Sequence, residues 1–410
     1  MEDLGSTSPT DWRYVSEGGA TMVFSYIGSH NPRFSGKVIR LRKTPRTHGA
    51  EEDDGEKDDP SPSFQSQVIS LLIGPEYLPH LESCQINPTW LTRLAVLAES
   101  SRPAHRVLEG SIDTSKHRAI LATDLIGRAG WAVEIKPKWG FLPNPRYLSP
   151  ETHKVKTSHS RFVMHTYYRT VIGHRSHPTS YDPLDLFSED EDRITRAIEA
   201  LWDAWIASEG ALNNLRISTA GRIITPSDAF TPSGDLAFDL DAASIGSRQG
   251  WAPGSLKQSF ARALLPLITQ TDLIRSIGVL QSSLDPLDIE GLTALWTRVH
   301  GVGIPLGSGE PEPSLDDWVA FARMYRSEGL KIDEDNPTKD QLRYHILAYL
   351  MSATFKDCSV ILRFPGPPSA EEGGKPSIAV IDLDPKSIGG FANWTRLDRH
   401  IAQAYTARCP

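Results

Sequence analysis

The chain has 410 residues and a formal net charge of -8, with 39% hydrophobic and 23% charged residues. A chain of this length can form two lobes or domains, each with its own hydrophobic core. It contains no apolar run long enough to span a bilayer, and its acidic, polar beginning does not have the pattern of a secretory signal. We therefore expect an ordinary globular protein that needs no membrane.

The three cysteines, Cys84, Cys358 and Cys409, are scattered along the chain without a CxxC pair. This spacing argues against a disulfide framework and against a cysteine-built zinc site, and it favours a reducing compartment. We therefore expect the protein in the nucleus, the cytoplasm or both. The negative net charge weighs against nucleic acid as a partner. Nothing in the composition demands a dimer, so we expect a monomer.

The first part of the chain, residues 1–128, predicts a small lobe rich in strands. Residues 12–43 have the pattern of two or three strands, and HRAILATDLIG has that of another. The acidic low-complexity stretch GAEEDDGEKDDPSPS cannot bury a core, so we expect a disordered insertion over residues 44–62. The segment SFQSQVISLLIG, residues 63–74, predicts one short amphipathic helix.

Within this lobe, EGGATMVFSYIG and GKVIRLRK contain the first candidate binding groups. Gly18 and Gly19 would let the backbone approach a ligand closely, with amides that can donate to phosphate oxygens. Arg40, on the following strand, could reach the same phosphates. For this segment alone, a hairpin turn beside an exposed basic edge strand is the favoured interpretation.

From residue 129 to residue 410 the pattern changes to longer helices with a few strands, which predicts a larger, mixed helical lobe. In SEDEDRITRAIEALWDAWIASEG, Ser188 and Glu191 have capping-box spacing and Gly210 would end the helix. Its buried stripe would consist of Ile194, Ile198, Leu201, Trp202, Trp205 and Ile206. Further helices are expected near residues 255–283, 287–299, 314–327 and 338–356.

Clustered cations occur in the segment EIKPKWGFLP and in the helix predicted from SRFVMHTYYR. Lys136 and Lys138 lie two apart on an extended stretch, so both ammonium groups would point to one face and need an anionic partner. Arg161, His165 and Arg169 recur every four residues and would share one helical face. A solvated surface is the alternative interpretation of both segments.

The segment NNLRI follows the capped helix directly and offers amides and a guanidinium together. Asn213, Asn214 and Arg216 could bind a hydroxyl and a phosphate there. In isolation, a common Asn-Asn turn is the favoured interpretation.

The C-terminal part carries the candidate acids. The segment TFKDCSVILRF predicts the end of a helix and the start of a strand, with Asp357 at the junction. The segment PSIAVIDLDPKS predicts a second strand, with Asp382 and Asp384 on one face at its end, and the Pro/Gly-rich connection makes the two strands a hairpin. In kinases, one acid orients or deprotonates the hydroxyl and another holds Mg²⁺. An Asp-rich turn is the alternative.

Taken in order, these segments resemble the inositol-pentakisphosphate 2-kinase family. The match covers residues 14–405 and runs through EGGATMVFSYIG, GKVIRLRK, EIKPKWGFLP, RFVMHTYYR, YDPLDLFS, NNLRI, FKDCSVIL, VIDLDPKS and LDRHIAQAY. The resemblance implies a two-lobed α+β kinase fold, distantly like that of protein kinases. It also implies transfer of the ATP γ-phosphate to the axial 2-hydroxyl of inositol 1,3,4,5,6-pentakisphosphate, giving inositol hexakisphosphate (phytate).

Carried over by position, the resemblance implies a role for each candidate residue. The ATP phosphates would contact Gly18, Gly19, Ala20 and Arg40. Thr123 and Asp124 would lie near the adenine hinge, and Glu134 would meet the ribose. Asp357 would activate the 2-hydroxyl, and Lys136 would neutralise charge on the transferring group. Mg²⁺ would be held by Asp382 and Asp384. The substrate phosphates would be held by Arg106, Lys138, Arg169, Asn213, Asn214, Arg216 and Lys386.

The chain departs from the family pattern at three positions. Arg169 replaces an expected lysine, Gly390 stands where a basic residue is expected, and Trp394 stands where a tyrosine is expected. Arg396 or Arg399 could compensate for the missing charge at Gly390. Some relatives carry a Cys/His zinc cluster, but this chain lacks the cysteines, so we expect Mg²⁺ and no zinc.

Two other functions remain open from the sequence. The chain could be an inositol polyphosphate kinase of different positional specificity, or a scaffold that binds inositol phosphates without turnover. The presence of Asp357, Asp382, Arg40 and Lys136 argues against the scaffold.

Overall fold

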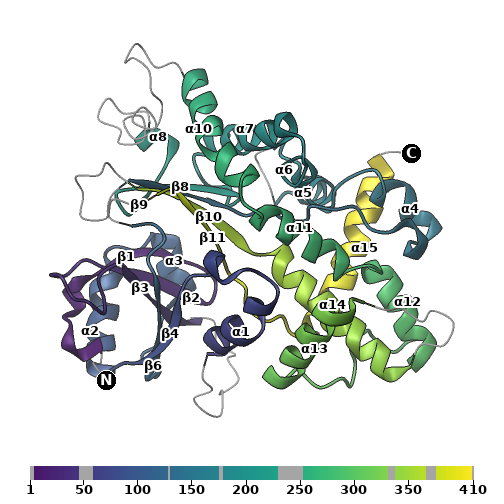
Figure 1. The fold of residues 1–410 in the computed structure, drawn as a ribbon, viewed down its shortest axis with the longest axis horizontal. Coiled ribbons are helices and arrows are strands. Elements are labelled where there is room, and N and C mark those ends of the chain that lie inside the picture. Colours follow the sequence, from purple (N-terminus) through teal and green to yellow (C-terminus); the bar gives the residue numbers. More distant parts are fainter. Residues whose placement is uncertain are drawn as a thin grey trace.

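A computed structural model describes residues 4–45, 59–127, 130–174, 179–229, 253–330, 338–365 and 375–408. Helices surround two antiparallel sheets, which confirms the expected two-lobed α+β fold (Figure 1). The strands of the first sheet come from residues 12–123, and those of the second from residues 131–381. The proposed lobe boundary at residues 128 and 129 lies outside the described residues and stays a prediction.

The first sheet has the strand order β1-β2-β3-β6-β4, with β5 beside β3. Its strands are β1 (Trp12–Glu17), β2 (Thr21–Tyr26), β3 (Lys37–Pro45), β4 (Leu81–Gln85), β5 (Gly110–Ile112) and β6 (Arg118–Thr123). The helices of this lobe are α1 (Ser61–Gln67), α2 (Pro88–Glu99) and α3 (Ala104–Glu109). The strands expected over residues 12–43 and in HRAILATDLIG are confirmed.

Alternation along β3 determines which of its side chains can meet a ligand. Ile39 and Leu41 are buried in a core that also contains Trp12 and Trp90. Successive side chains of a strand point to opposite faces, so Arg40 projects away from this core. Its guanidinium lies 3.9 Å from Asp384, a residue of the second lobe. The strand pattern therefore directs Arg40 toward the space between the two sheets.

The expected disordered insertion over residues 44–62 is too long at both ends. Thr44 belongs to β3 and pairs with β5. Asp59 forms an ion pair with Arg42 at 2.7 Å, and helix α1 begins at Ser61. Residues 46–58 lie outside the described residues. The helix expected over residues 63–74 is shorter, because α1 ends at Gln67 and a 3-10 turn, η3 (Ile69–Leu71), follows.

The second sheet has the strand order β11-β10-β7-β8-β9. Its strands are β7 (Trp131–Ile135), β8 (Leu215–Thr219), β9 (Arg222–Ile224), β10 (Ser359–Phe364) and β11 (Ser377–Ile381). The helices of this lobe are α4 (Pro150–Lys156), α5 (Arg161–Val171), α6 (Pro183–Leu186), α7 (Glu191–Ala207), α8 (Pro226–Ala229), α10 (Pro253–Thr269), α11 (Leu273–Ser283), α12 (Asp288–His300), α13 (Leu315–Glu328), α14 (Lys339–Lys356) and α15 (Phe391–Arg408). The expected pairing of β10 with β11 is confirmed as antiparallel.

Helix α7 begins differently from the sequence expectation. Asp190, not Ser188, is its N-cap, because the Asp190 carboxylate accepts from the backbone amides of the first turn, including that of Arg193. The expected stripe is buried except at Ile206, which is half-buried. Gly210 has a φ of 75° and follows the last turn, as expected for a residue that ends a helix.

Three of the four remaining helix predictions are confirmed by α12, α13 and α14. The helix expected over residues 255–283 is instead two helices, α10 and α11, separated by residues 270–272. Among the described residues, no single helix has the length and apolar composition to cross a membrane. The pair 256–269 and 273–300 meets that test only jointly, across a bend of 65°.

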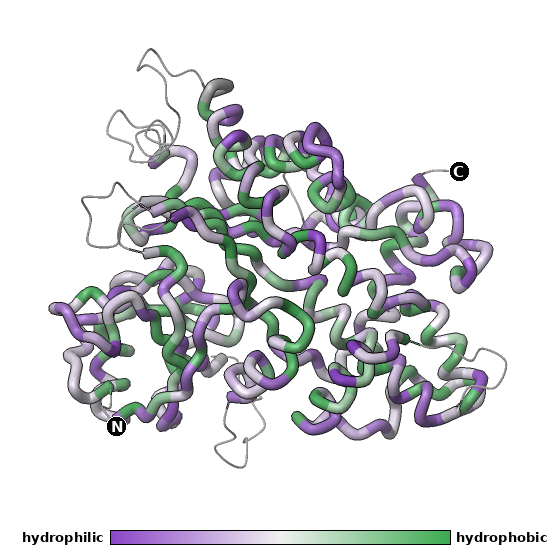
Figure 2. Tube along the Cα trace, viewed as in Figure 1, coloured by the Kyte–Doolittle hydropathy of each residue, from purple (hydrophilic) through white to green (hydrophobic). Residues whose placement is uncertain are grey.

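The main core packs the second sheet against helices of the same lobe. The Trp131 ring on β7 stacks on Phe364 of β10, with centroids 4.1 Å apart, and Trp202 of α7 packs on Phe260 of α10 at 4.9 Å. Hydrophobic segments accordingly run through the interior of this lobe in Figure 2. This packing fixes the ends of β7, β10 and β11, which carry most of the candidate site.

Candidate active site

Two cavities adjoin where the first sheet faces the second. The inter-sheet cavity, about 380 Å³, is lined by residues of both sheets, including Gly18, Arg40, Glu134, Lys136 and Asp382. The cationic cavity, about 800 Å³, is lined by residues of α3, α5, β8, α14 and α15, of the segment after β7, and of neighbouring loops. Three side chains line both cavities, so the two spaces meet there: Arg106, Asn213 and Arg216.

The Gly-Gly turn between β1 and β2 forms one edge of the inter-sheet cavity. The Gly18 amide donates to Thr21 O at 2.9 Å, which closes the turn. No atom lies within 4 Å of the position that a Cβ would take on Gly18 or Gly19. The fold itself therefore leaves room for side chains at both positions. Ala20 belongs to the same turn but does not line the cavity.

A buried ion network, which the sequence did not indicate, supports this turn. The Glu17 carboxylate contacts Lys43 at 2.5 Å and Arg102 at 2.8 Å. Burial would raise the pKa of Glu17, but hydrogen bonds and charges of Arg102 and Lys43 outweigh it and lower the pKa to about 2. Lys43 Nζ also donates to Gly18 O at 3.1 Å. The end of the basic strand β3 thus holds the turn.

Thr123 and Asp124 line the inter-sheet cavity where the chain leaves the first sheet. The Asp124 carboxylate accepts from Ser25 Oγ at 2.5 Å and from the amide of Gly127 at 2.9 Å. Thr123 Oγ1 accepts from the His80 amide at 3.1 Å. Both side chains are therefore engaged within the protein, and so are both backbone amides, which donate to His80 O at 3.1 Å and to Gly36 O at 2.9 Å.

The two acids that follow β11 line the inter-sheet cavity. Strand β11 ends at Ile381, and Asp382 has a φ of 60°, a left-handed conformation that is uncommon for residues other than glycine, although aspartate adopts it more readily than most. Asp382 Oδ2 lies 3.4 Å from Lys136 Nζ and 3.1 Å from Ser359 Oγ. Asp384 Oδ1 accepts from Ser61 Oγ at 2.7 Å. Both acids lie beyond the strand rather than on it, yet they reach the same cavity.

Lys136 and Lys138 do not share a face, so that expectation is wrong. Strand β7 ends at Ile135, and Lys138 has a φ of 64°, which breaks the alternation of an extended chain. Lys136 faces Asp382 in the inter-sheet cavity, whereas Lys138 faces Asp357 in the cationic cavity. The segment therefore supplies one cation to each side of the junction.

Glu134 and Arg216 are opposite one another on β7 and β8. The Arg216 guanidinium lies 3.6 Å from Glu134 Oε2, and Ser359 Oγ donates to Glu134 Oε1 at 2.9 Å. Asn214 accepts from the Lys136 amide through its backbone oxygen at 3.0 Å, and Asn213 lies in the same turn at the junction of the cavities. The Asn-Asn pair is thus both a turn and part of the candidate site.

Asp357 occupies the junction predicted for it, at the C-cap of α14, with Cys358 between it and β10. Its carboxylate accepts from Lys138 Nζ at 3.2 Å and from Lys386 Nζ at 3.3 Å. Burial would raise the pKa of Asp357, but these two lysines outweigh it and the pKa is lowered. The side chain is 59% exposed, so a ligand in the cationic cavity can reach it.

Seven lysine and arginine side chains line the cationic cavity, against two aspartates. The members with a substrate-binding role implied by the resemblance are Arg106, Lys138, Arg169, Arg216 and Lys386. Arg161, which the sequence placed on the same helical face as Arg169, and Lys356 join them. The shared face of Arg161, His165 and Arg169 on α5 is confirmed, since all three line the cavity.

The sequence missed Lys356 because the second half of α14 is buried almost all round, so no hydrophobic stripe distinguishes a ligand-facing side there. Its ammonium contacts Asp285 at 2.5 Å and lies 4.0 Å from the centre of the Trp139 ring.

The two departures in the C-terminal segment are in contact with one another. Trp394 lines the cationic cavity, and its ring atoms lie 2.8 Å from the position that a Cβ on Gly390 would take. The larger ring at position 394 thus fills the space beside the glycine. Arg396 donates to Asn393 instead, and neither Arg396 nor Arg399 lines the cavity. Compensation by one of these arginines for the missing charge at Gly390 stays a prediction.

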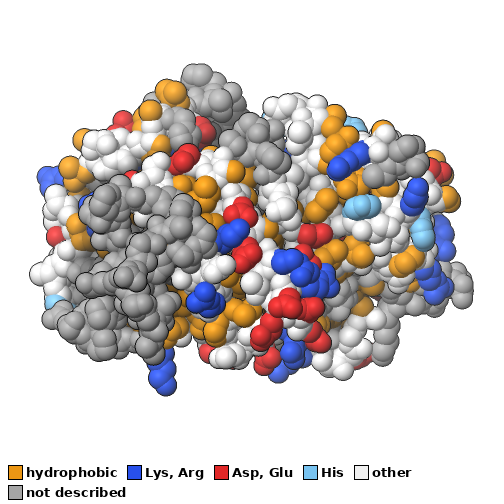
Figure 3. Space-filling model, turned by 90° about the horizontal axis from the view of Figure 1, so that it is seen from above, with side chains coloured by type: hydrophobic (Ala, Val, Ile, Leu, Met, Phe, Trp, Pro, Cys, Tyr) orange, Lys and Arg blue, Asp and Glu red, His pale blue; other side chains and the backbone are white. Residues whose placement is uncertain are grey.

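Outside the cavities, charges of both signs are interspersed. Figure 3 shows acidic and basic side chains close together near the middle of one face. On α6, α7 and α10, Arg193 donates to Asp185 at 2.7 Å and Lys257 to Asp203 at 3.2 Å. Paired charges of this kind create no extended field of one sign. In the cationic cavity, by contrast, the lysines and arginines among the described residues outnumber the aspartates by seven to two.

A glycine turn at the rim of one cavity, an acid pair inside it and an adjoining cation-lined cavity define a two-lobed kinase, a class that works by positioning phosphates. The sequence model of a family described as inositol-pentakisphosphate 2-kinase matches residues 14–400. The chain therefore belongs to the inositol-pentakisphosphate 2-kinase family and is an enzyme of that family, as its motifs predict.

Relatives carrying that name cover nearly the whole chain. The relative from Cryptococcus neoformans var. neoformans is 32% identical over 96% of this chain and 93% of its own length. The relative from Arabidopsis thaliana is 27% identical over 99% of this chain and 95% of its own. The relative from Danio rerio is 24% identical over 98% and 94%.

Proposed function

We propose that this enzyme transfers the γ-phosphate of ATP to the 2-hydroxyl of inositol 1,3,4,5,6-pentakisphosphate and forms inositol hexakisphosphate. The observation that carries the proposal is the junction of two cavities of different character at Arg106, Asn213 and Arg216. A nucleotide in one cavity and a polyanion in the other would bring the two reacting groups together at that junction, so positioning would supply much of the catalysis.

The inter-sheet cavity suits ATP in size and in chemistry. Its volume of about 380 Å³ lies in the range of small-molecule sites. Val23, Val38, Ala122 and Ile361 give it apolar walls for a purine. The Gly18 amide is engaged with Thr21 O, so the Gly19 amide and the Arg40 guanidinium are the groups that can meet phosphate oxygens at its other end.

The acid pair fits a magnesium ion by its donor chemistry. Mg²⁺ prefers carboxylate oxygens and would neutralise charge on the phosphates. Asp382 Oδ1 has no hydrogen-bond partner among the described residues, and Asp384 Oδ2 is paired only loosely, 3.9 Å from Arg40. Asp382 and Asp384 would therefore hold the ion, with Lys136 beside them to neutralise charge on the transferring group.

The cationic cavity suits a highly phosphorylated inositol. Each phosphate carries roughly -1.5 to -2 charges at neutral pH, so five carry about -8 to -10. Such a ligand needs many converging cations, and seven lysines and arginines line this cavity in a chain whose net charge is -8. Its volume of about 800 Å³ is twice that of the inter-sheet cavity.

Asp357 is the group that would accept the proton of the 2-hydroxyl. Its lowered pKa keeps it ionised at neutral pH, because Lys138 and Lys386 stabilise the carboxylate. When substrate phosphates engage the same lysines, this stabilisation is shared and the pKa of Asp357 rises, which makes it a stronger base. The loose transition state of phosphoryl transfer demands little proton abstraction before the phosphate moves.

Incubation with Mg-ATP and inositol 1,3,4,5,6-pentakisphosphate, followed by anion-exchange separation, tests the proposal. We expect a hexakisphosphate peak that is lost in Asp357→Ala. Calorimetric binding of the pentakisphosphate without any product would refute the kinase and favour a scaffold.

A further inference from the structure

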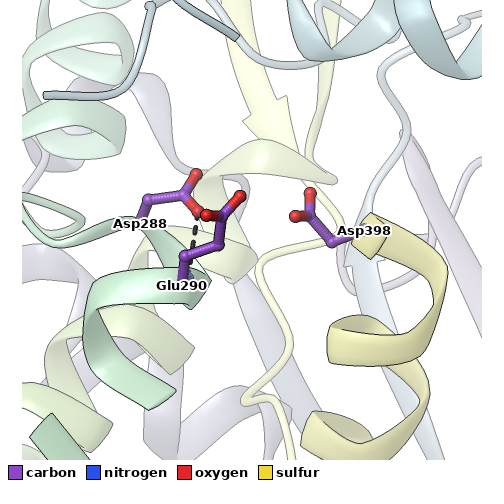
Figure 4. A group of neighbouring side chains, drawn as sticks. All are labelled: Asp288, Glu290 and Asp398. Carbon is purple, nitrogen blue, oxygen red and sulfur yellow. Dashed lines mark hydrogen bonds between the residues drawn. The ribbon is translucent and has the colours of Figure 1, made fainter. Parts of the chain in front are cut away.

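A group of three carboxylates lies beside the cationic cavity, with oxygens within 4.8 Å of one another (Figure 4). Asp288 and Glu290 come from the start of α12, and Asp398 comes from α15. Such a group could hold a metal ion, but Lys156 Nζ lies 2.8 Å from Asp288, 2.7 Å from Glu290 and 2.7 Å from Asp398. An ammonium group therefore already occupies the centre.

The charges in this network favour an ionised Asp398. Burial would lower the pKa of Lys156, but the three carboxylates outweigh it and raise the pKa, so the ammonium persists. Burial raises the pKa of Asp288 to about 6, with Lys156 opposing the shift. For Asp398, burial is outweighed by Arg161 and Lys156, and the pKa is lowered. The carboxylate of Asp398 is thus available to orient a cation.

That cation is Arg161, the first residue of α5. Arg161 Nε donates to Asp398 Oδ1 at 3.0 Å, while Asp398 Oδ2 contacts Lys156. The guanidinium carbon lies 5.4 Å from the centre of the Trp139 ring. One edge and one face of the guanidinium are therefore held, by Asp398 and by Trp139.

The remaining edge of Arg161 is the part that can bind a ligand. The side chain lines the cationic cavity and is 14% exposed. Asp398 is its hydrogen-bond partner within the described residues, and that bond uses Nε alone. The two Nη groups are left as a fixed pair of donors, the geometry that arginine uses to bind phosphate with two parallel hydrogen bonds.

We propose that Asp398, anchored by Lys156, is a positioning residue that holds Arg161 for a phosphate of the substrate. The identity of that substrate rests on the proposed function. Arginine loses less entropy on binding when its orientation is already set, so the network would lower the cost of capturing one phosphate. It would act on binding of the inositol phosphate and not on binding of ATP.

Asp398→Asn is the test variant. In this variant the buried Lys156 ammonium keeps two carboxylate partners, Asp288 and Glu290, so its charge stays compensated. We expect the apparent KM for inositol pentakisphosphate to rise about tenfold, with kcat and the KM for ATP within twofold of the wild type. Asp398→Glu should restore part of the loss. The double variant Arg161→Met/Asp398→Asn should be no worse than Arg161→Met, since Asp398 acts through Arg161.

Arg343→Met is the matched control. Arg343 is also a partly buried arginine that pairs with a carboxylate, Glu310, at 3.4 Å, but it lines neither cavity. Its KM values should be unchanged, and thermal unfolding of every variant should report an intact fold.

Three results would overturn the inference. The first is an unchanged KM for inositol pentakisphosphate in Asp398→Asn, and the second is an equal rise in the KM for inositol pentakisphosphate and the KM for ATP. The third is a double variant whose rise in KM is the sum of the rises in the two single variants. If the wild type forms no product, the proposed function fails. In that case calorimetric binding of inositol pentakisphosphate to the same variants decides the positioning role.

Discussion

Replacing Asp357 by asparagine should lower kcat and, at the same time, tighten the binding of inositol pentakisphosphate. General bases contribute typically about 100- to 10,000-fold to a rate, or about 3–5 kcal/mol of barrier. Because a loose transition state needs little proton abstraction, we expect kcat to fall toward the lower end, by about 100-fold. Binding should become tighter, because Lys138 and Lys386, now 3.2 and 3.3 Å from the Asp357 carboxylate, would be free to meet phosphates.

The size of the gain in binding follows from the exposure of the carboxylate. The side chain is 59% exposed, so solvent screens both ion pairs, and exposed pairs contribute about 1 kcal/mol at most. We therefore expect the Kd for inositol pentakisphosphate to fall by about fivefold in calorimetry, while anion-exchange assays record the loss of turnover. Asp316→Asn, on the exposed start of α13, is the control and should change neither quantity. A variant that retains a tenth of wild-type turnover, or binds substrate more weakly, would refute the assigned role.

Substitutions in the Gly-Gly turn, at Lys138 and at Gly390 should each change a different property of the enzyme. Gly19→Ala should leave the thermal unfolding midpoint unchanged, because the fold has open space there, but it should raise the KM for ATP. A KM for ATP equal to that of the wild type would show that ATP binds elsewhere. Lys138→Met removes a cation that lowers the pKa of Asp357, so the acid limb of the kcat profile should move to higher pH, and the KM for inositol pentakisphosphate should rise more than that for ATP. An unmoved limb would contradict this. Gly390→Arg should lower the free energy of unfolding by about 1–3 kcal/mol in chemical denaturation, because the new side chain collides with the Trp394 ring. Adding Trp394→Ala should restore that stability. An unchanged stability of Gly390→Arg alone would contradict this, because it would show that the Trp394 ring moves aside at no cost.

Local patterns predicted the elements and most of the candidate cavity residues. Asp357 lies at the end of α14 as expected, because the end of the helix, the acid and the start of the strand follow one another within a few residues. The face shared by Arg161 and Arg169 follows from helical spacing alone. The order of motifs then indicated the family, which single motifs could not.

The features that were missed depend on contacts between distant residues or on backbone conformation. Glu17 meets Arg102 across 85 positions, and Arg161 meets Asp398 across 237, so no local pattern shows either pair. The side chains of Lys136 and Lys138 enter different cavities because Lys138 has a left-handed φ. The sequence did not predict this conformation, because lysine rarely adopts it. The N-cap of α7 was misplaced because both Ser188 and Asp190 have the chemistry of a cap.

In the proposed reaction, the phosphate is transferred to the 2-hydroxyl of a pentakisphosphate held in the cationic cavity. The most direct measurement supplies γ-labelled ATP and Mg²⁺ with a panel of inositol pentakisphosphate isomers, each having a different free hydroxyl. We expect label in hexakisphosphate from the isomer with the free 2-hydroxyl, and little from the others. Equal labelling of several isomers, or labelling of a different one, would contradict it.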